Sequence, residues 1–294
     1  MPQFFDHLVL ATRDLAGQAD LYRRLGFQVG ARNQHPWGTH NHIVQLEGGF
    51  LELIGVAEGT KMPPVHAAPR QFSFGGFIGE FLVAHEGLAM LALRAADAMA
   101  EAARFAAAGI GDFEPFHFSR SAARPDGSRK EVAFTLAFAE SNLIADAGFF
   151  ACQHHFPENF WSPAMQVHPN TAEKLAGVVM VAEYPADHAE FLAHFLGQRL
   201  MLSTSMGLEI DTGGGKVEVL TPLAAKFRYG EDLGGAGNAA PHFCGYRIVA
   251  GDMAQVRAVL ASGDIAMAMH HGRIVVPAAA AGGAAIIFEP RGTA

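Results

Sequence analysis

Two polar residues interrupt apolar segments near the start of the chain, and their side chains could bind a metal ion. His7 lies within FFDHLVLATRD and Glu52 lies within GFLELIG. A polar side chain inside an apolar strand must be hydrogen-bonded or serve a function. Imidazole nitrogens and carboxylate oxygens are common ligands of iron, manganese and zinc. The two residues therefore indicate one divalent metal ion, although each alone is more often a hydrogen-bonded or solvated structural residue.

The segment from Phe4 to Gly55 supplies the elements that would position these side chains. Its patterns predict a strand in FFDHLVLATRD and a helix in DLAGQADLYRRLGF that ends at Gly26. Three further strands are predicted in FQVGARNQ, HNHIVQLE and GFLELIG, with a turn at 47–49 between the last two. The segment is thus a βαβββ unit with His7 on its first strand and Glu52 on its last.

The same order of elements recurs three times, beginning at GLAMLALRAAD, KLAGVVMVAEY and FCGYRIVAGD. The last strands of the third and fourth units carry Glu218 and Glu289. The positions aligned with His7 in the later units hold side chains without an imidazole, namely Met90, Val178 and Gly245. We therefore predict an α+β fold of four βαβββ units.

The length of 294 residues fits about two domains of ~150 residues each. The stretch WSPAMQVHPNTAE contains prolines and shows no clear periodicity. We place the boundary there, which gives an N-terminal domain of residues 1–165 and a C-terminal domain of residues 172–294, each with two units.

The first unit resembles a half-domain of the vicinal-oxygen-chelate superfamily, which includes glyoxalase I, bleomycin-resistance proteins and extradiol dioxygenases. FDHLVLATRDL, RRLGF, GTHNHIVQL and GGFLELIG are most similar to its glyoxalase-like branch. The resemblance implies that two units pair into one cupped sheet with a pocket between them, so that four units form two domains of this type. It also implies that the first and last strands of a unit are neighbours, so that His7 and Glu52 can reach one ion.

The resemblance implies a third ligand from the last strand of the second unit, FFACQHHF. Aligning Gly148 with Gly283 of the fourth unit places His154 opposite the glutamate of that unit, and we predict His154 as the third ligand. His155 is the alternative, because a shift of one residue turns the other face of a strand inward. Gln153 is a further candidate and could bind a substrate oxygen instead. The histidine pair could also be an ordinary polar end of a strand.

The chain departs from the family pattern in a way that bears on where the chemistry lies. Familiar metalloenzymes of the group draw ligands from the first strands of both units, whereas Met90 is a poor ligand for a hard cation. Extradiol dioxygenases of this layout carry their iron in the C-terminal domain. There this chain has Val178 and Gly245 in place of the histidines, which leaves Glu218 and Glu289 without partners. We therefore expect the site in the N-terminal domain, and a C-terminal copy that is structural or forms a homodimer.

Three other polar residues are candidates for substrate binding. If the turn at 47–49 has two residues, Gln45 faces Glu52 and Asn41 lies on the same side of the sheet. Both could then bind a substrate or orient the carboxylate. The alternative is that the histidines on either side of Asn41 face inward. Arg120, at the end of FHFSR, could bind a substrate carboxylate or phosphate, although a solvated loop arginine is the plainer interpretation.

The composition limits the partners and the compartment. The formal net charge of −8 argues against nucleic acid. The cysteines Cys152 and Cys244 are too few for a disulfide framework and fit a reducing cytosol. No apolar run reaches the ~18 residues of a membrane span, and MPQFFDHL lacks the basic start of a signal peptide. We predict a cytoplasmic protein whose partner is a small molecule, with no nucleic-acid or membrane partner.

Two functions are compatible with these patterns. In the first, a divalent ion held by His7, Glu52 and His154 polarises a substrate with adjacent oxygens, in an enzyme of the lyase, isomerase or dioxygenase type. In the second, the protein binds a small molecule without catalysis, as bleomycin-resistance proteins do. The two differ in metal content.

Overall fold

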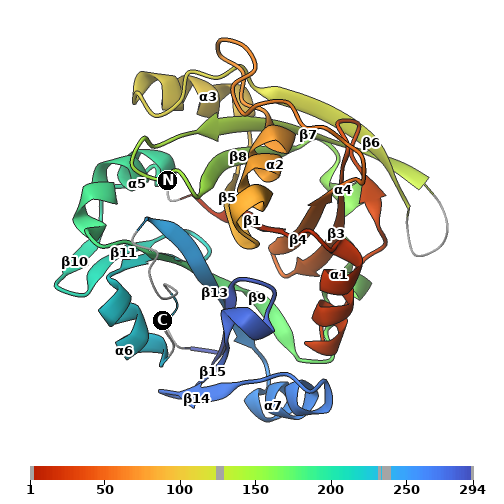
Figure 1. The fold of residues 1–294 in the computed structure, drawn as a ribbon, viewed down its shortest axis with the longest axis vertical. Helices are drawn as coiled ribbons and strands as arrows, with labels where there is room; N and C mark the ends of the chain where they lie inside the picture. The colour runs from red at the N-terminus through yellow and green to blue at the C-terminus, as the bar shows by residue number, and fades with distance from the viewer. Residues whose placement is uncertain (1–2, 124–128, 231–232, 234–239, 293–294) are drawn as a thin grey trace.

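The computed structural model describes residues 3–123, 129–230, 233 and 240–292. Each half of the chain forms one eight-stranded sheet, and the two sheets occupy the upper and lower parts of Figure 1. The strands of the first sheet are β1 (Phe5–Ala11), β2 (Asn33–Gln34), β3 (Thr39–Leu46), β4 (Gly49–Val56), β5 (Gly87–Arg94), β6 (Phe116–Ala123), β7 (Arg129–Ala139) and β8 (Gly148–His154). Those of the second are β9 (Ala172–Val181), β10 (Leu202–Thr204), β11 (Gly207–Asp211), β12 (Lys216–Leu220), β13 (His242–Ala250), β14 (Ala268–His270), β15 (Arg273–Val276) and β16 (Ala285–Pro290).

The strand order is the same in both sheets: β2-β3-β4-β1-β5-β8-β7-β6 in the first and β10-β11-β12-β9-β13-β16-β15-β14 in the second. Within each unit the first strand pairs in parallel with the last, and the first strands of two units pair antiparallel at the centre of the sheet. This arrangement confirms the predicted α+β fold of four βαβββ units.

The helices are α1 (Leu15–Arg24), α2 (Phe74–Ala84), α3 (Ala98–Ala107), α4 (Pro157–Phe160), α5 (Ala189–Leu196), α6 (Pro222–Tyr229) and α7 (Met253–Ser262). Short 3-10 turns occur at Pro163–Gln166, Pro185–His188 and Ala278–Ala280. Asp14, Asp97 and Asp252 cap α1, α3 and α7, each accepting hydrogen bonds from backbone N–H groups of the first turn. Such caps stabilise a helix by about 1 kcal/mol.

The two faces of the first sheet pack differently. Leu8 and Leu10 of β1 lie in a core that also contains residues of the second sheet, such as Val178. Val9 and Ala11, on the opposite face, lie in a separate core that α2 covers. The sheets are therefore joined through one face each, and the other face of the first sheet is left to form a pocket.

Helix α2 was not predicted, because its sequence, FGGFIGEFLVA, is rich in glycine. Tertiary contacts offset this low propensity, since Phe74 and Ile78 are buried on the sheet and Ser73 caps the helix.

The proposed domain boundary, 165/172, falls between β8 and β9, and we keep the division into two domains as a proposal. The sequence also predicts a turn at 122–128, of which residues 124–128 lie outside the described residues, and a glycine-rich link at 226–241, of which residues 231–232 and 234–239 do. No helix in the described part of the chain is long and apolar enough to cross a membrane.

Candidate functional site

The strand pairings show which residues are equivalent in the four units. In the first unit, His7 pairs with Phe50 of β4, and Glu52 lies two residues further along that strand. In the third unit, Gly177 pairs with Lys216 of β12, and Glu218 lies two residues further along that strand. Gly177, and not Val178, therefore takes the place of His7 in the third unit.

The central pairs of the two sheets identify the remaining positions. His7 lies opposite Ala92 across β1 and β5, as Gly177 lies opposite Arg247 across β9 and β13. Ala92 and Arg247 thus take the place of His7 in the second and fourth units. In both units the prediction was wrong by two residues, because Ala92 and Arg247 lie five residues before the aspartate that caps the next helix, whereas His7 lies seven residues before Asp14.

The closing strands give a second correction. In the second unit Ala92 pairs with Phe150, and Cys152 lies two residues beyond that partner. In the fourth unit Arg247 pairs with Ile287, and Glu289 lies two residues beyond it. Cys152, rather than His154, is therefore the equivalent of Glu289. The alignment of Gly148 with Gly283 was wrong because Gly148 is already paired within β8, whereas Gly283 lies before β16 begins.

His7 and Glu52 point into the same side of the sheet, where both are buried. His7 Nε2 lies 3.7 Å from Glu52 Oε2, and His7 Nδ1 lies 2.7 Å from Asp6 Oδ2. Nδ1–H of a neutral His7 donates a hydrogen bond to the Asp6 carboxylate. The lone pair of Nε2 then points toward the Glu52 carboxylate. Two acceptors this close repel each other unless a proton or a metal ion lies between them.

Asp6 is a central residue of the site that the sequence did not indicate. It has no partner opposite it on β5, since Phe5 pairs with Leu93 and His7 with Ala92. This bulge lets two consecutive side chains point the same way, which a regular strand forbids. Burial alone would raise the pKa of Asp6, but the imidazoles of His154 and His7 lower it below its ordinary value.

The structure places the three candidates at the end of β8 differently. His154 Nε2 lies 3.0 Å from Asp6 Oδ2 and does not meet His7 and Glu52 directly. His155 is exposed, and its Nε2 bonds to Thr135 Oγ1 at 2.8 Å. Gln153 accepts a hydrogen bond from the N–H of Ala98 at the start of α3. His155 and Gln153 therefore lie on the opposite face of β8, and their predicted places in the pocket are wrong.

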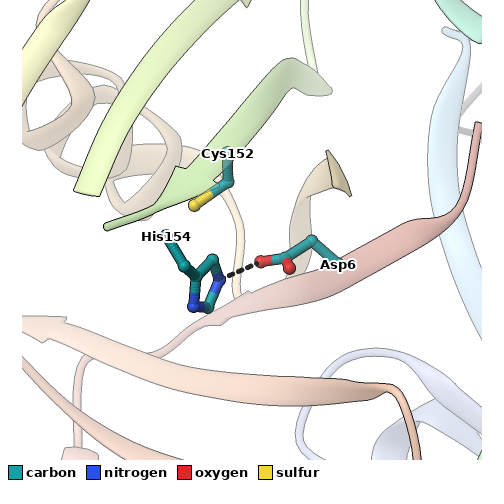
Figure 2. Close-up of side chains that lie close together, drawn as sticks. All are labelled: Asp6, Cys152 and His154. Atoms are coloured by element: carbon teal, nitrogen blue, oxygen red, sulfur yellow. Dashed lines mark hydrogen bonds and ion pairs between the residues drawn. The ribbon is translucent and has the colours of Figure 1, made fainter. Parts of the chain in front are cut away.

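Among the described residues, one group of three potential ligand atoms lies within 4.8 Å of one another. It consists of Asp6, Cys152 and His154, whose side chains point toward one another from β1 and β8 in Figure 2. Cys152 is buried, and burial together with the nearby carboxylates of Asp6 and Glu52 raises its pKa well above the ordinary value.

A narrow cavity of about 40 Å³ is lined by His7, Glu52 and Cys152. This volume holds a few water molecules, so a larger ligand must displace ring side chains. The polar residues of its lining are His7, His35, Asn41, Glu52, Arg120 and Cys152. The apolar ones are Trp37, Ile43, Phe50, Phe74, Phe118, Phe134, Leu136, Phe150 and Phe160. An outer groove of about 670 Å³ shares Ile43, Arg120 and Phe160 with this inner cavity, which places Arg120 at the junction.

Asn41 faces the cavity as predicted, and the flanking histidines do not line it. Its side-chain amide donates to Glu52 Oε1 and lies 3.4 Å from Nε2 of His35. His35 was missed because it precedes a strand in a loop. Burial, followed by the neighbouring Arg120 and His40, lowers the pKa of His35 to about 3. The imidazole of His35 is therefore neutral at pH 7, with Nε2 3.9 Å from Glu52 Oε1.

Gln45 does not face Glu52, because the β3–β4 register pairs Glu52 with Ile43. The amide of Gln45 instead donates to the carbonyl of Phe160 at 2.8 Å and accepts from the N–H of Ser162 at 2.9 Å. Each group of the amide thus makes one hydrogen bond to the segment that forms a wall of the outer groove, and the role of Gln45 in substrate binding stays a prediction.

Arg120 reaches the cavity from β6, as its predicted role requires. Nη1 donates to Asn33 Oδ1 at 2.8 Å, while Nε is buried and has no hydrogen-bond partner among the described residues. Burial lowers the pKa of Arg120, and the negative charge of Glu52 opposes this effect. The guanidinium group therefore keeps a donor for an anionic group of a ligand.

In the C-terminal sheet, the guanidinium group of Arg247 occupies the equivalent site. Arg247 donates from Nη1 to Glu218 at 3.2 Å, and from Nε and Nη2 to Glu289 at 3.0 and 2.9 Å. Burial alone would lower the pKa of Arg247, but the two glutamates raise it. The prediction that Glu218 and Glu289 lack partners was wrong, because the alignment placed Gly245 where Arg247 stands.

Comparisons with known proteins agree with this architecture. A family model described as a glyoxalase-like domain matches residues 5–196. A hypothetical protein from Staphylococcus aureus superposes with a TM-score of 0.66 at 12% identity, covering 98% of this chain and 99% of that one. No functionally curated protein matches in sequence.

Two further structures are similar in fold. A mutant of 4-hydroxymandelate synthase from Streptomyces coelicolor has a TM-score of 0.59 at 13% identity, with 100% of this chain and 94% of that chain covered. A halotolerant catechol dioxygenase has a TM-score of 0.53 at 8% identity, with 99% and 87% covered. At these identities the likeness shows a shared fold and no more.

Proposed function

Because the chain belongs to the family of glyoxalase-like domains, we propose that it is a metal-dependent enzyme acting on a small substrate with adjacent oxygen atoms. The observation that supports this proposal is the buried pair of His7 Nε2 and Glu52 Oε2, 3.7 Å apart. A divalent cation between these two acceptors would remove their repulsion and give each a partner.

The residues around this pair fit a metal ion. Ligating histidines almost always donate their other ring N–H to a carboxylate or carbonyl, as His7 does to Asp6. Asn41 donates to Glu52 and so orients the second ligand. His35 Nε2 is the nearest further nitrogen to this carboxylate. Two imidazoles and a carboxylate suit ferrous iron, manganese or zinc.

When bound, such an ion supplies Lewis-acid chemistry to a coordinated substrate oxygen. The protein's own residues would do the rest. The aromatic wall excludes water and packs against an apolar or aromatic part of the substrate, and Arg120 binds an anionic substituent. Two structural neighbours are named for a hydroxymandelate and a catechol, and a hydroxylated aromatic compound is the class that we propose, for a lyase, isomerase or dioxygenase reaction.

Metal analysis of the purified protein tests the ligand pair. We expect near one equivalent of iron, manganese or zinc at the pair, and affinity reduced by more than about 100-fold in His7→Ala and Glu52→Gln, since losing even an outer-shell partner costs 10–100-fold. His155→Ala is the matched control, because it removes an exposed histidine from the neighbouring strand end and should bind metal normally. Unchanged affinity in both site variants would contradict the proposal.

The role of Arg120 has a separate test. Arg120→Met should weaken the binding of hydroxybenzoates at least about tenfold, because a charge-assisted hydrogen bond contributes about 1.5–3 kcal/mol. Catechol, which carries no carboxylate, serves as the comparison ligand and should lose little affinity. Titration calorimetry measures both, and equal losses for the two ligands would remove Arg120 from the proposed role.

A second candidate function is small-molecule binding without catalysis. Ala92 favours it, because the opening strand of the second unit offers no ligand at the position equivalent to His7. Protein purified without chelator would then carry no metal at this pair and would still bind the ligand.

A further inference from the structure

We propose that Asp6, Cys152 and His154 form a second cation site, behind His7, for a divalent ion that prefers a thiolate, such as Zn²⁺. The site does not depend on the proposed function, since it uses neither His7 nor Glu52 as a ligand. Its three ligand atoms are one carboxylate oxygen, one sulfur and one imidazole nitrogen.

The geometry suits a small ion. Each residue offers one ligand atom, and these atoms lie within 4.8 Å of one another; the side chains of Asp6 and His154 are already in contact, Oδ2 to Nε2 at 3.0 Å. Zinc bonds to oxygen and nitrogen of about 2.0–2.2 Å place two neighbouring ligand atoms roughly 3.0–3.5 Å apart. The three side chains converge from two strands of one sheet, which fixes their positions (Figure 2).

Unsatisfied buried atoms point to a missing partner. Asp6 is fully buried, yet its Oδ1 has no hydrogen-bond partner among the described residues. Nε of Arg94 lies 3.7 Å from Oδ1, beyond hydrogen-bond distance. A buried carboxylate oxygen left without a partner is costly. A bound cation would satisfy it, while Oδ2 keeps its hydrogen bond from His7.

The cysteine explains which ion this would be. Cys152 is the residue of the second unit that is equivalent to Glu52. A sulfur atom is therefore available there in place of a carboxylate oxygen. Thiolate, imidazole and carboxylate together favour zinc over magnesium or calcium. Cys152 also lines the inner cavity, which gives the ion an entry path and the thiol proton an exit to solvent on binding.

Cobalt substitution tests the site, because a thiolate bound to Co²⁺ gives a charge-transfer band in the near ultraviolet. The full-length protein should show this band with Co²⁺, and excess EDTA should remove it. Cys152→Ser should lose the band and bind Zn²⁺ at least about tenfold more weakly. Cys244→Ser is the matched control, because Cys244 is the other buried cysteine and should leave the band unchanged.

His7→Ala and Glu52→Gln separate this site from the one in the proposed function. Both variants should keep the charge-transfer band while losing the metal of the His7–Glu52 pair. Absence of the band in Co²⁺-treated wild-type protein would overturn the inference, and so would its persistence in Cys152→Ser. The wild-type measurement decides the matter even where a variant fails to fold.

Discussion

Replacing Arg247 by methionine is expected to lower the free energy of unfolding by about 3 kcal/mol. The guanidinium group is buried between Glu218 and Glu289, which are almost inaccessible to solvent. Removing one partner of a buried ion pair costs about 3–5 kcal/mol, because the remaining charge stays desolvated. We expect the lower end of this range, since Arg228 still contacts Glu218 and Arg273 still contacts Glu289.

Equilibrium denaturation of the wild-type and Arg247→Met proteins gives this difference. Arg291→Met is the control, because Arg291 pairs with Glu173 at the exposed surface and such pairs contribute little to stability. If both variants lose the same small amount of stability, Arg247 does not act as the internal cation of the second sheet.

Acidification from pH 6.5 to pH 4 is expected to cost about 3 kcal/mol of stability through His35 alone. The pKa of this histidine falls from an ordinary value of 6.5 to about 3 in the folded protein. Between these values the unfolded chain binds more protons than the folded one, so a falling pH favours unfolding. The stability is complete above pH 6.5 and is lost as the pH falls toward 3, at about 1.4 kcal/mol per pH unit.

Denaturant unfolding at several pH values checks this expectation. His35→Gln removes the titrating group, so its stability should change with pH less steeply than that of the wild type over the same interval. His155→Gln removes an exposed histidine and should leave the wild-type slope unchanged. Equal slopes for the wild type and His35→Gln would show that the pKa of His35 in the folded protein stays near its ordinary value, which would contradict the prediction.

The parts of the site that follow from local pattern could be predicted from the sequence. His7 and Glu52 are polar residues that interrupt two apolar strands, and the family resemblance implies that these strands are neighbours in the sheet. Asp14 and Asp252 begin helices because their carboxylates accept backbone N–H groups of the first turn. The four units were visible because each repeats a strand, a capped helix and three strands.

The parts that depend on pairing between distant strands could not be predicted. The bulge that turns Asp6 toward His7 exists only when β1 pairs with β5. Only the strand pairing shows that Ala92 and Arg247 are the equivalent positions, because the connection to the helix cap is two residues shorter in these units than in the first. An alignment on glycines chose His154, whereas the register of β5 and β8 chooses Cys152. Neighbours along the chain carry no information on such shifts.

The core that joins the two sheets bears on why the C-terminal half persists. Tyr22 and Tyr246 share a buried hydrogen bond of 2.7 Å across it, and apolar side chains of both halves fill one continuous cluster. Deleting either half would expose this entire layer to water. The C-terminal half is therefore needed for the shared core, even though Arg247 occupies its own equivalent of the site.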